Sequence, residues 1–149
     1  MLAERPEVET HLIITMTARQ VIAQETERTV QQVESLANRV YDPTDLAAPI
    51  ASGSFPVDGM VIAPCSVKML SAVANSYAAD LVSRAADVTL KEGRPLVLVV
   101  RETPLHLGHL RLMARAAEIG ALIFPPVPAF YGHPQTVADI VDGTVGRIL

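Results

Sequence analysis

The stretch that decides the fold is RPLVLVVRETPLHLGHLRLM, residues 94–113. An apolar run over residues 95–100 ends on Arg101 and Glu102, and Pro104 then begins a segment of helical period. A run of this kind, without polar alternation, is typical of a strand buried on both faces of a parallel sheet. Because burying an unpaired charge is costly, the adjacent cation and anion indicate that the carboxyl end of this strand opens into a ligand site.

The rest of the chain repeats this alternation of short apolar runs and helical segments. The expected strands, each buried on both faces, cover residues 11–15, 60–64, 95–100 and 121–124, and the expected helices cover residues 17–28, 30–39, 66–91, 105–119 and 134–148. This order predicts an α/β fold: one domain, residues 1–149, with a doubly wound, Rossmann-like or flavodoxin-like parallel sheet and helices on both faces.

Two of the expected helices have an apolar stripe at helical spacing. The stripes consist of Leu70, Val73, Ala74, Tyr77 and Leu81 in the third helix, and of Leu107, Leu110, Ala114 and Ala117 in the fourth. Spacing of three, four and seven residues puts such side chains on one face, so we expect these two faces to pack on the sheet.

Composition excludes several classes of protein. Half of the 149 residues are hydrophobic and 19% are charged, which excludes a disordered chain. The net charge of −4, the scattered basic residues and the 4% aromatic content give no sign of nucleic-acid binding. The sequence has no apolar run of the roughly 20 residues that span a membrane, and its single cysteine fits a reducing compartment, so we expect a cytoplasmic protein without a membrane segment.

Sheets of this kind bind ligands beyond the carboxyl ends of their strands. The sequence places Thr15, Ser66, Lys68, Arg101 and Glu102 there. Ser66 begins a helix, whose amino terminus would suit a phosphate, although a serine at this position also serves simply as a helix cap. Arg101 and Glu102 either line a cleft or pair with other charged groups at a helix start.

Other side chains are less decisive. His106 and His109 could share a metal, but no third ligand is close in sequence. Cys65 is either a nucleophile or a small buried residue at a strand end. Four prolines between residues 125 and 134 stiffen a loop that either holds Tyr131 over a pocket or packs as a lid.

Read together, the segments resemble the UbiX-type flavin prenyltransferases. The resemblance runs along the whole chain and rests on ASGSF (51–55), PCSVK (64–68), RAADVTLKEGRPLVLVVRETPLHLGHL (84–110), PPVPAFY (125–131) and HPQTV (133–137). It implies transfer of a dimethylallyl group from dimethylallyl phosphate to reduced FMN, without a metal. The product, prenylated FMN, would serve a separate UbiD-type decarboxylase in a pathway such as ubiquinone biosynthesis.

The resemblance also implies roles for individual residues. Thr15, Ser66, Val67, Lys68, Met69 and Arg101 would contact FMN, Lys91, Tyr131 and Arg147 would hold the prenyl phosphate, and Glu25 and Glu102 would be the catalytic carboxylates. At two positions the chain departs from the usual family residue. Thr15 replaces a serine and keeps the hydroxyl, whereas Met69 replaces a threonine and loses it.

Two further expectations follow from the resemblance. Family members begin with a strand and a GxSGAxG loop, which are absent from this sequence, so the chain is expected to lack the first strand of the sheet and part of the phosphate site. Family members also form homo-oligomers, commonly dodecamers, whose active sites are shared between subunits.

Two other functions remain open at this stage. One is an FMN-dependent cysteine decarboxylase-like enzyme, because related flavoproteins use bound FMN as an oxidant. The other is a non-catalytic flavoprotein, impaired in FMN binding or acting as a regulatory subunit. We also expect that the chain alone does not decarboxylate an aromatic acid, because that activity would belong to the enzyme that receives its product.

Overall fold

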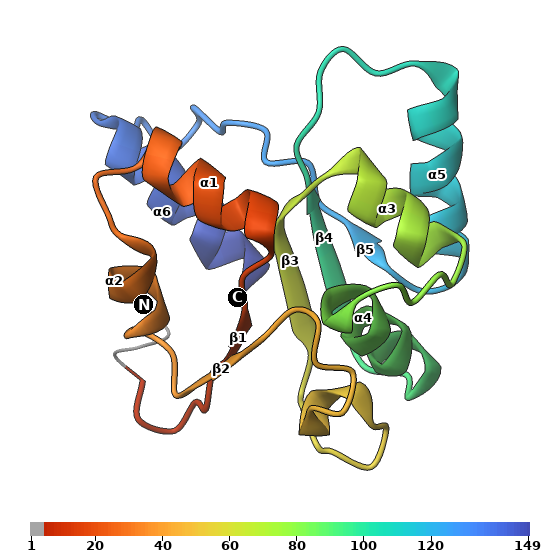
Figure 1. The fold of residues 1–149 in the computed structure, drawn as a ribbon. Coiled ribbons are helices and arrows are strands. Elements are labelled where there is room, and N and C mark those ends of the chain that lie inside the picture. Colours follow the sequence, from red (N-terminus) through yellow and green to blue (C-terminus); the bar gives the residue numbers. More distant parts are fainter. Residues whose placement is uncertain (1–4) are drawn as a thin grey trace.

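The fold is built from parallel strands connected by helices (Figure 1). The structure is a computed structural model that describes residues 5–149. The elements are β1 (His11–Ile13), α1 (Met16–Glu25), α2 (Val30–Glu34), β2 (Arg39–Tyr41), the 3-10 helix η2 (Pro49–Ala51), β3 (Met60–Cys65), α3 (Val67–Ala74), α4 (Leu81–Lys91), β4 (Leu96–Val100), α5 (Leu107–Glu118), β5 (Leu122–Ile123) and α6 (Val137–Ile148).

β4 is the middle strand of a three-stranded parallel sheet in the order β3-β4-β5. Leu96 and Leu98 are fully buried, and only Val97 among the five residues of β4 is not buried. The expectation of a strand buried on both faces is therefore confirmed for β4. It is wrong for β3 and β5, which form the edges of this sheet and have exposed residues.

β1 and β2 form a second, two-stranded parallel sheet. The expected single sheet is therefore wrong in detail: in the part of the chain that the structure describes, β1 pairs only with β2, and β3 only with β4. Ile13 on β1 nevertheless packs against the buried cores beside both sheets, which joins the two halves. β2 differs from the expectation of one helix over residues 30–39, because the helix ends at Glu34 and the strand begins at Arg39.

The expected helix over residues 66–91 is wrong as well, because it is two helices. α3 ends at Ala74, Ser76 adopts a positive φ of 51°, and Asp80 caps α4 by accepting a hydrogen bond from the Ser83 amide. A non-glycine residue at positive φ cannot continue a right-handed helix. Tyr77, which we expected on the buried stripe, consequently lies in the connecting loop and is 67% exposed.

The buried face of α5 differs from the expected one. Leu107, Leu110, Ala114 and Ala117 are all exposed. Ala116 is fully buried instead, and Leu112 and Met113 pack against the main core beside it. These three residues form an equally good helical stripe, so periodicity alone could not tell which face the sheet would cover. α3 packs against α5, and both α3 and α4 contact β4.

We predict that Leu98→Ala lowers the free energy of unfolding by about 2–5 kcal/mol, because it leaves a cavity beside the buried face of β4. Urea denaturation of the two proteins measures the difference. Leu122→Ala is the matched control, since Leu122 lies on the neighbouring strand and is 57% exposed. It should change the free energy by only about 0.5 kcal/mol, and a similar cost for both variants would contradict the assignment of β4 as the centre of the core.

Candidate functional site

The site is built where β3 and β4 end side by side. Cys65 is in register with Val100, and the Arg101 amide donates a hydrogen bond to the Cys65 carbonyl at 3.2 Å. Parallel pairing therefore brings Ser66 and Arg101 to the same edge, although they are 35 positions apart in sequence. This arrangement is the one expected for a sheet that binds its ligand beyond the carboxyl ends of its strands.

Two helices begin at the predicted cofactor residues, and each is capped by a hydroxyl. The Ser66 Oγ accepts a hydrogen bond from the Met69 amide, and the Thr15 Oγ1 accepts one from the Ala18 amide, both at 3.2 Å. Ser66 is thus a helix cap, as one of the two expectations had it. The amides of Val67 and Lys68 lie in the first turn of α3, where helical geometry gives them no acceptor in the helix itself.

Arg101 forms an ion pair with Glu25 across the two halves of the molecule. The guanidinium of Arg101 donates to both carboxylate oxygens of Glu25, at 2.9 and 3.3 Å. These hydrogen bonds, and then the charge of Arg101, lower the pKa of Glu25, and the same contacts raise the pKa of Arg101. Both side chains are about half exposed, so the ends of the pair face solvent. The structure therefore brings together a predicted catalytic carboxylate and a predicted cofactor residue.

The other predicted carboxylate, Glu102, follows Arg101 at the same sheet edge. Its Oε1 accepts a hydrogen bond from the Thr103 amide at 3.1 Å, and the residue is exposed. No ion pair to Glu102 is found within residues 5–149, so its carboxylate remains open to solvent.

Tyr131 and Arg147 are also brought together, although they are far apart in sequence. The Nη1 of Arg147 donates to the Tyr131 hydroxyl over 3.4 Å, which links the loop before α6 to the last turn of α6. Both side chains are exposed, Tyr131 by 78%. A guanidinium beside a phenol hydroxyl offers several donors to one anion.

Lys91 does not lie at the sheet edge that carries Ser66 and Arg101. It ends α4, before the amino end of β4, whereas Arg101 follows the carboxyl end of that strand. The five residues of β4 separate the two ends by about 17 Å at roughly 3.3 Å per residue. Within one chain the structure therefore does not bring Lys91 to Arg101, and its ammonium contacts Glu92 instead.

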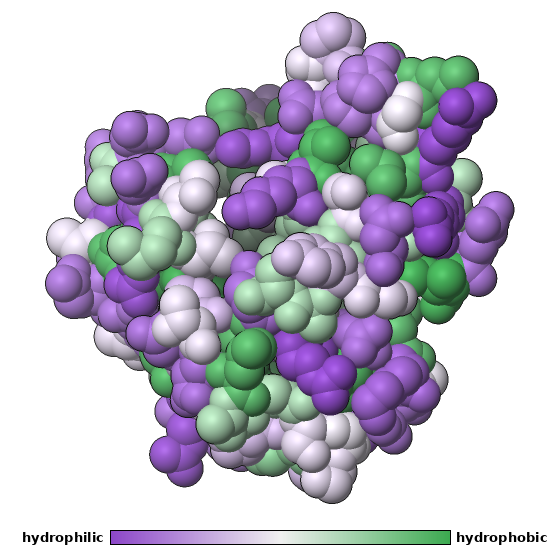
Figure 2. Space-filling view, turned by 45° about the vertical axis from the view of Figure 1, so that its right-hand side comes forward, coloured by the Kyte–Doolittle hydropathy of each residue, from purple (hydrophilic) through white to green (hydrophobic). Residues whose placement is uncertain are grey.

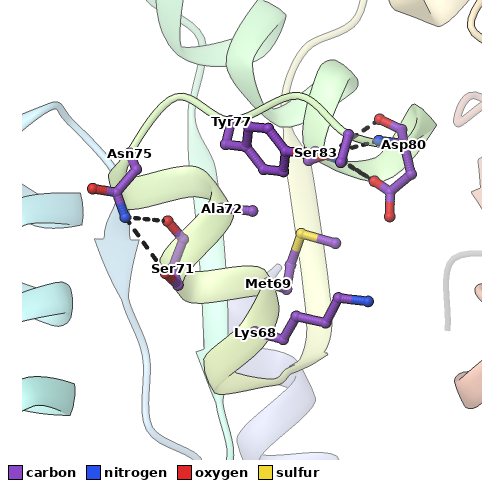
Figure 3. Close-up of a pocket in the computed structure, with 9 residues that line it drawn as sticks. Lys68, Met69, Ser71, Ala72, Asn75, Tyr77, Asp80 and Ser83 are labelled. Carbon is purple, nitrogen blue, oxygen red and sulfur yellow. Dashed lines mark hydrogen bonds between the residues drawn. The ribbon is translucent and has the colours of Figure 1, made fainter.

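Figure 3 shows a cavity of about 770 Å³ between α3, the loop after it and the start of α4. Lys68 and Met69 point toward it from α3, and the Tyr77 ring lies across it. Asp80 and Ser83 close the far side through their mutual capping hydrogen bonds. Sequence reasoning missed Tyr77 as a cavity residue, and the only signal was the Asn75–Ser76 pair, which is a common turn signal.

The two side chains with open alternatives, Cys65 and His109, are also placed. Cys65 is fully buried, and burial raises the pKa of its thiol to about 12, so it is a core residue and not a nucleophile at neutral pH. The rings of His106 and His109 are tilted by 34° with their centres 3.6 Å apart, and His106 caps α5 by accepting a hydrogen bond from the Gly108 amide. Among residues 5–149 the structure has no group of three or more metal-binding side chains.

Within residues 5–149, no helix is long and apolar enough to cross a membrane.

The donors at the carboxyl edge fit an anionic cofactor. The first turn of α3, the Lys68 ammonium and the Arg101 guanidinium supply positive charge, and Thr15 supplies a hydroxyl. A helix amino terminus with adjacent cations is a common phosphate site.

Comparison with known proteins decides the family. The sequence profile of the family described as "Flavoprotein" matches residues 1–149. The flavin prenyltransferase UbiX of Salmonella typhimurium is 57% identical over 149 residues, which is 100% of this chain and 79% of the relative. This chain belongs to the flavoprotein family, as a UbiX-type member.

Solved structures of UbiX-type proteins have the same fold. AnUbiX (PadA1), solved in complex with FMN and dimethylallyl pyrophosphate, superimposes with a TM-score of 0.97 at 49% identity, over 99% of this chain and 79% of that one. A dodecameric FMN-dependent UbiX-like decarboxylase from Escherichia coli O157:H7 also gives a TM-score of 0.97, at 50% identity, over 99% and 80% of the two chains. The α/β, flavodoxin-like fold predicted from the sequence is confirmed.

The ion pair gives a prediction for the UbiX-type site. Arg101→Gln should raise the pKa of the Glu25 carboxyl toward that of an ordinary glutamate, because the variant removes the positive charge that stabilises the carboxylate. Carbon-detected NMR titration of the glutamate side chains measures this shift. Arg28→Gln, at an exposed position in the loop after α1, is the control and should leave Glu25 unchanged.

The same pair makes stability depend on pH. Because the pKa of Glu25 is lower in the folded protein than in the unfolded chain, the stabilisation is present above the ordinary glutamate pKa of about 4.3 and is lost as the pH falls below it. The difference in stability between the parent and Arg101→Gln should therefore shrink on acidification. A constant difference from neutral pH down to acid would show that the pair does not form in solution.

Proposed function

We propose that this protein is a flavin prenyltransferase, which transfers a dimethylallyl group from dimethylallyl phosphate to reduced FMN. The observation that supports this function best is the 57% identity to a flavin prenyltransferase along the entire chain. Ser66 and Arg101 lie at one sheet edge, which agrees with it, and Thr15 caps α1 at the end of β1. The product would be prenylated FMN, used by a separate UbiD-type decarboxylase.

In this proposal FMN lies at the carboxyl edge of the strands. Ser66, Val67, Lys68 and Met69 at the start of α3, together with Thr15 and Arg101, would bind it. Reduced FMN would supply an electron-rich ring that accepts the prenyl group. Arg101 would exchange part of its contact with Glu25 for the flavin, and the released Glu25 carboxylate would face the positive charge that develops on the allyl group.

The phosphate is the leaving group. When the carbon–oxygen bond of the allylic phosphate breaks, the electron pair stays on the phosphate, so negative charge grows there. Arg147 and Tyr131 are already paired and would donate hydrogen bonds to that charge. Glu102, which is open to solvent, would take part in the proton transfer that completes the reaction.

Lys91 fits this function only if it comes from a second copy of the chain. Within one chain it lies at the opposite end of β4 from Arg101, yet it is predicted to hold the prenyl phosphate with Tyr131 and Arg147. We propose that the protein is a homo-oligomer, of the dodecameric kind described for one relative, in which Lys91 completes the site of a neighbour.

Apolar side chains left at the surface support this assembly. Leu107 and Leu110 on α5 and Val137 and Val141 on α6 are about half exposed or more. Figure 2 shows green apolar groups remaining between hydrophilic ones on the face drawn there. Exposed apolar side chains of this kind are covered where subunits meet.

The direct test incubates the protein with dimethylallyl phosphate and FMN reduced by dithionite without oxygen. Mass spectrometry of the extracted flavin should show FMN enlarged by one five-carbon prenyl unit. FMN recovered unchanged, with protein whose fold and FMN binding have been verified, would contradict the proposal and favour a non-catalytic flavoprotein.

Arg147→Ala should raise the KM for dimethylallyl phosphate at least about tenfold, since a hydrogen bond to a charged group contributes roughly 1.5–3 kcal/mol. Tyr131→Phe removes one neutral donor and should have a smaller effect. Arg111→Ala, an exposed arginine on α5, is the matched control. Equal KM values for Arg147→Ala and Arg111→Ala would remove Arg147 from the phosphate site.

One relative is described as a decarboxylase, and a cysteine decarboxylase-like enzyme is one of the alternatives, so the protein's own decarboxylase activity must be tested. We expect no carbon dioxide from the purified protein with cinnamic or hydroxybenzoic acid, or with a peptide ending in cysteine. Release of carbon dioxide from either substrate class without a partner enzyme would contradict the proposal.

A further inference from the structure

The end of α4 lies directly against the turn formed by residues 51–55, with almost no space between them. A Cβ atom placed on Gly53 would lie 2.6 Å from the Nζ of Lys91 and closer still to the Oε1 of Glu92. Both distances are below any normal contact, so a side chain at this position would displace the ends of these two flexible side chains. The φ of Gly53 is not in the left-handed region, so the backbone conformation itself does not require a glycine here.

The turn is held in place by two arginines. Arg94 donates to the carbonyls of Gly53 and Phe55, at 3.0 and 2.9 Å, and Arg84 donates to the carbonyl of Ala51 at 3.1 Å. Hydrogen bonds from a guanidinium to backbone carbonyls are charge-assisted and fix the acceptor in place. Gly53 therefore presents a fixed surface to the Lys91–Glu92 pair.

Lys91 and Glu92 are neighbours in sequence and form an ion pair with each other. Lys91 donates to the Glu92 carboxylate, and this hydrogen bond, followed by the charge of Lys91, lowers the pKa of Glu92. Side-chain exposure is 49% for Lys91 and 34% for Glu92, so both ends of the pair are accessible to solvent. A free lysine has several rotamers, and a fixed acceptor on one side restricts them.

We propose that Glu92 and Gly53 are positioning residues, which hold the ammonium of Lys91 in one place at the surface so that it can meet a phosphate. This inference rests on the proposed function for the identity of the phosphate, that of dimethylallyl phosphate. Whether Glu92 and Gly53 restrict the position of Lys91 can be measured independently of that function. Glu92 acts through Lys91 and is not itself a catalytic residue.

The first experiment measures how accessible the Lys91 amine is, independently of the reaction. The intact protein is acetylated with a limiting amount of an N-hydroxysuccinimide ester, and peptide mass spectrometry gives the rate at each lysine. Glu92→Ala should raise the rate at Lys91 about threefold, in line with the loss of one partly exposed ion pair, while the rate at Lys68 serves as the internal reference. Gly53→Ala should raise it as well, because the added methyl group displaces the pair. Unchanged rates at Lys91 in both variants would overturn the proposal.

The second experiment measures the consequence for the reaction. Glu92→Ala should raise the KM for dimethylallyl phosphate about threefold with little change in kcat. Glu92→Gln should bring the KM back close to that of the parent protein, because the amide oxygen still accepts a hydrogen bond from Lys91. In a Lys91→Ala background, Glu92→Ala should have no further effect. Glu118→Gln, at the exposed end of α5, is the control.

The outcomes separate the two proposals. A lower KM in Glu92→Ala would show that Glu92 competes with the phosphate for Lys91, and an equal effect with and without Lys91 would show a merely structural role; either result overturns the inference. If the parent protein makes no prenylated FMN, the proposed function fails, and the acetylation rates still decide whether Glu92 and Gly53 hold Lys91.

Discussion

The parallel pairing of β3 with β4 is the constraint on which the rest of the structure depends. β4 has helices α3 and α4 against it and a strand on each side, and its buried leucines form the centre of the main core. Parallel pairing also makes the two strands end together, which puts the cap of α3 and Arg101 at one edge. The same interaction therefore stabilises the fold and assembles the site.

The second sheet is tied to the first by side chains. Ile13 packs against both cores, and the Glu25–Arg101 pair connects the end of α1 to the end of β4. An exposed ion pair contributes little to stability, so its main effect here is to fix the relative orientation of two groups with proposed roles. The opposite end of β4 is organised differently, since there the arginines bind backbone carbonyls and Lys91 has a local partner.

Sequence reasoning predicted the long, strongly patterned elements and failed where local signals were weak. β4, α1 and the start of α3 were expected nearly as they are found. The break between α3 and α4 lies at Ser76, which has a positive φ, and the Asn75–Ser76 pair is only a short turn signal inside a long helical pattern. The buried face of α5 differs from the predicted one because Leu107 and Leu110 match a helical stripe as well as Leu112, Met113 and Ala116 do. Only the position of the sheet distinguishes the two faces.

The sequence by itself determined the α/β class, the buried strand before Arg101 and the set of candidate residues, because apolar runs, caps and the family motifs are local features. The tertiary structure decided which candidates meet. In the folded chain Glu25 pairs with Arg101, and Tyr131 pairs with Arg147. Cys65 is buried with a raised thiol pKa, and Lys91 lies beside Glu92 at the other end of β4. Contacts between residues far apart in sequence depend on strand pairing and helix packing, and no local pattern encodes them.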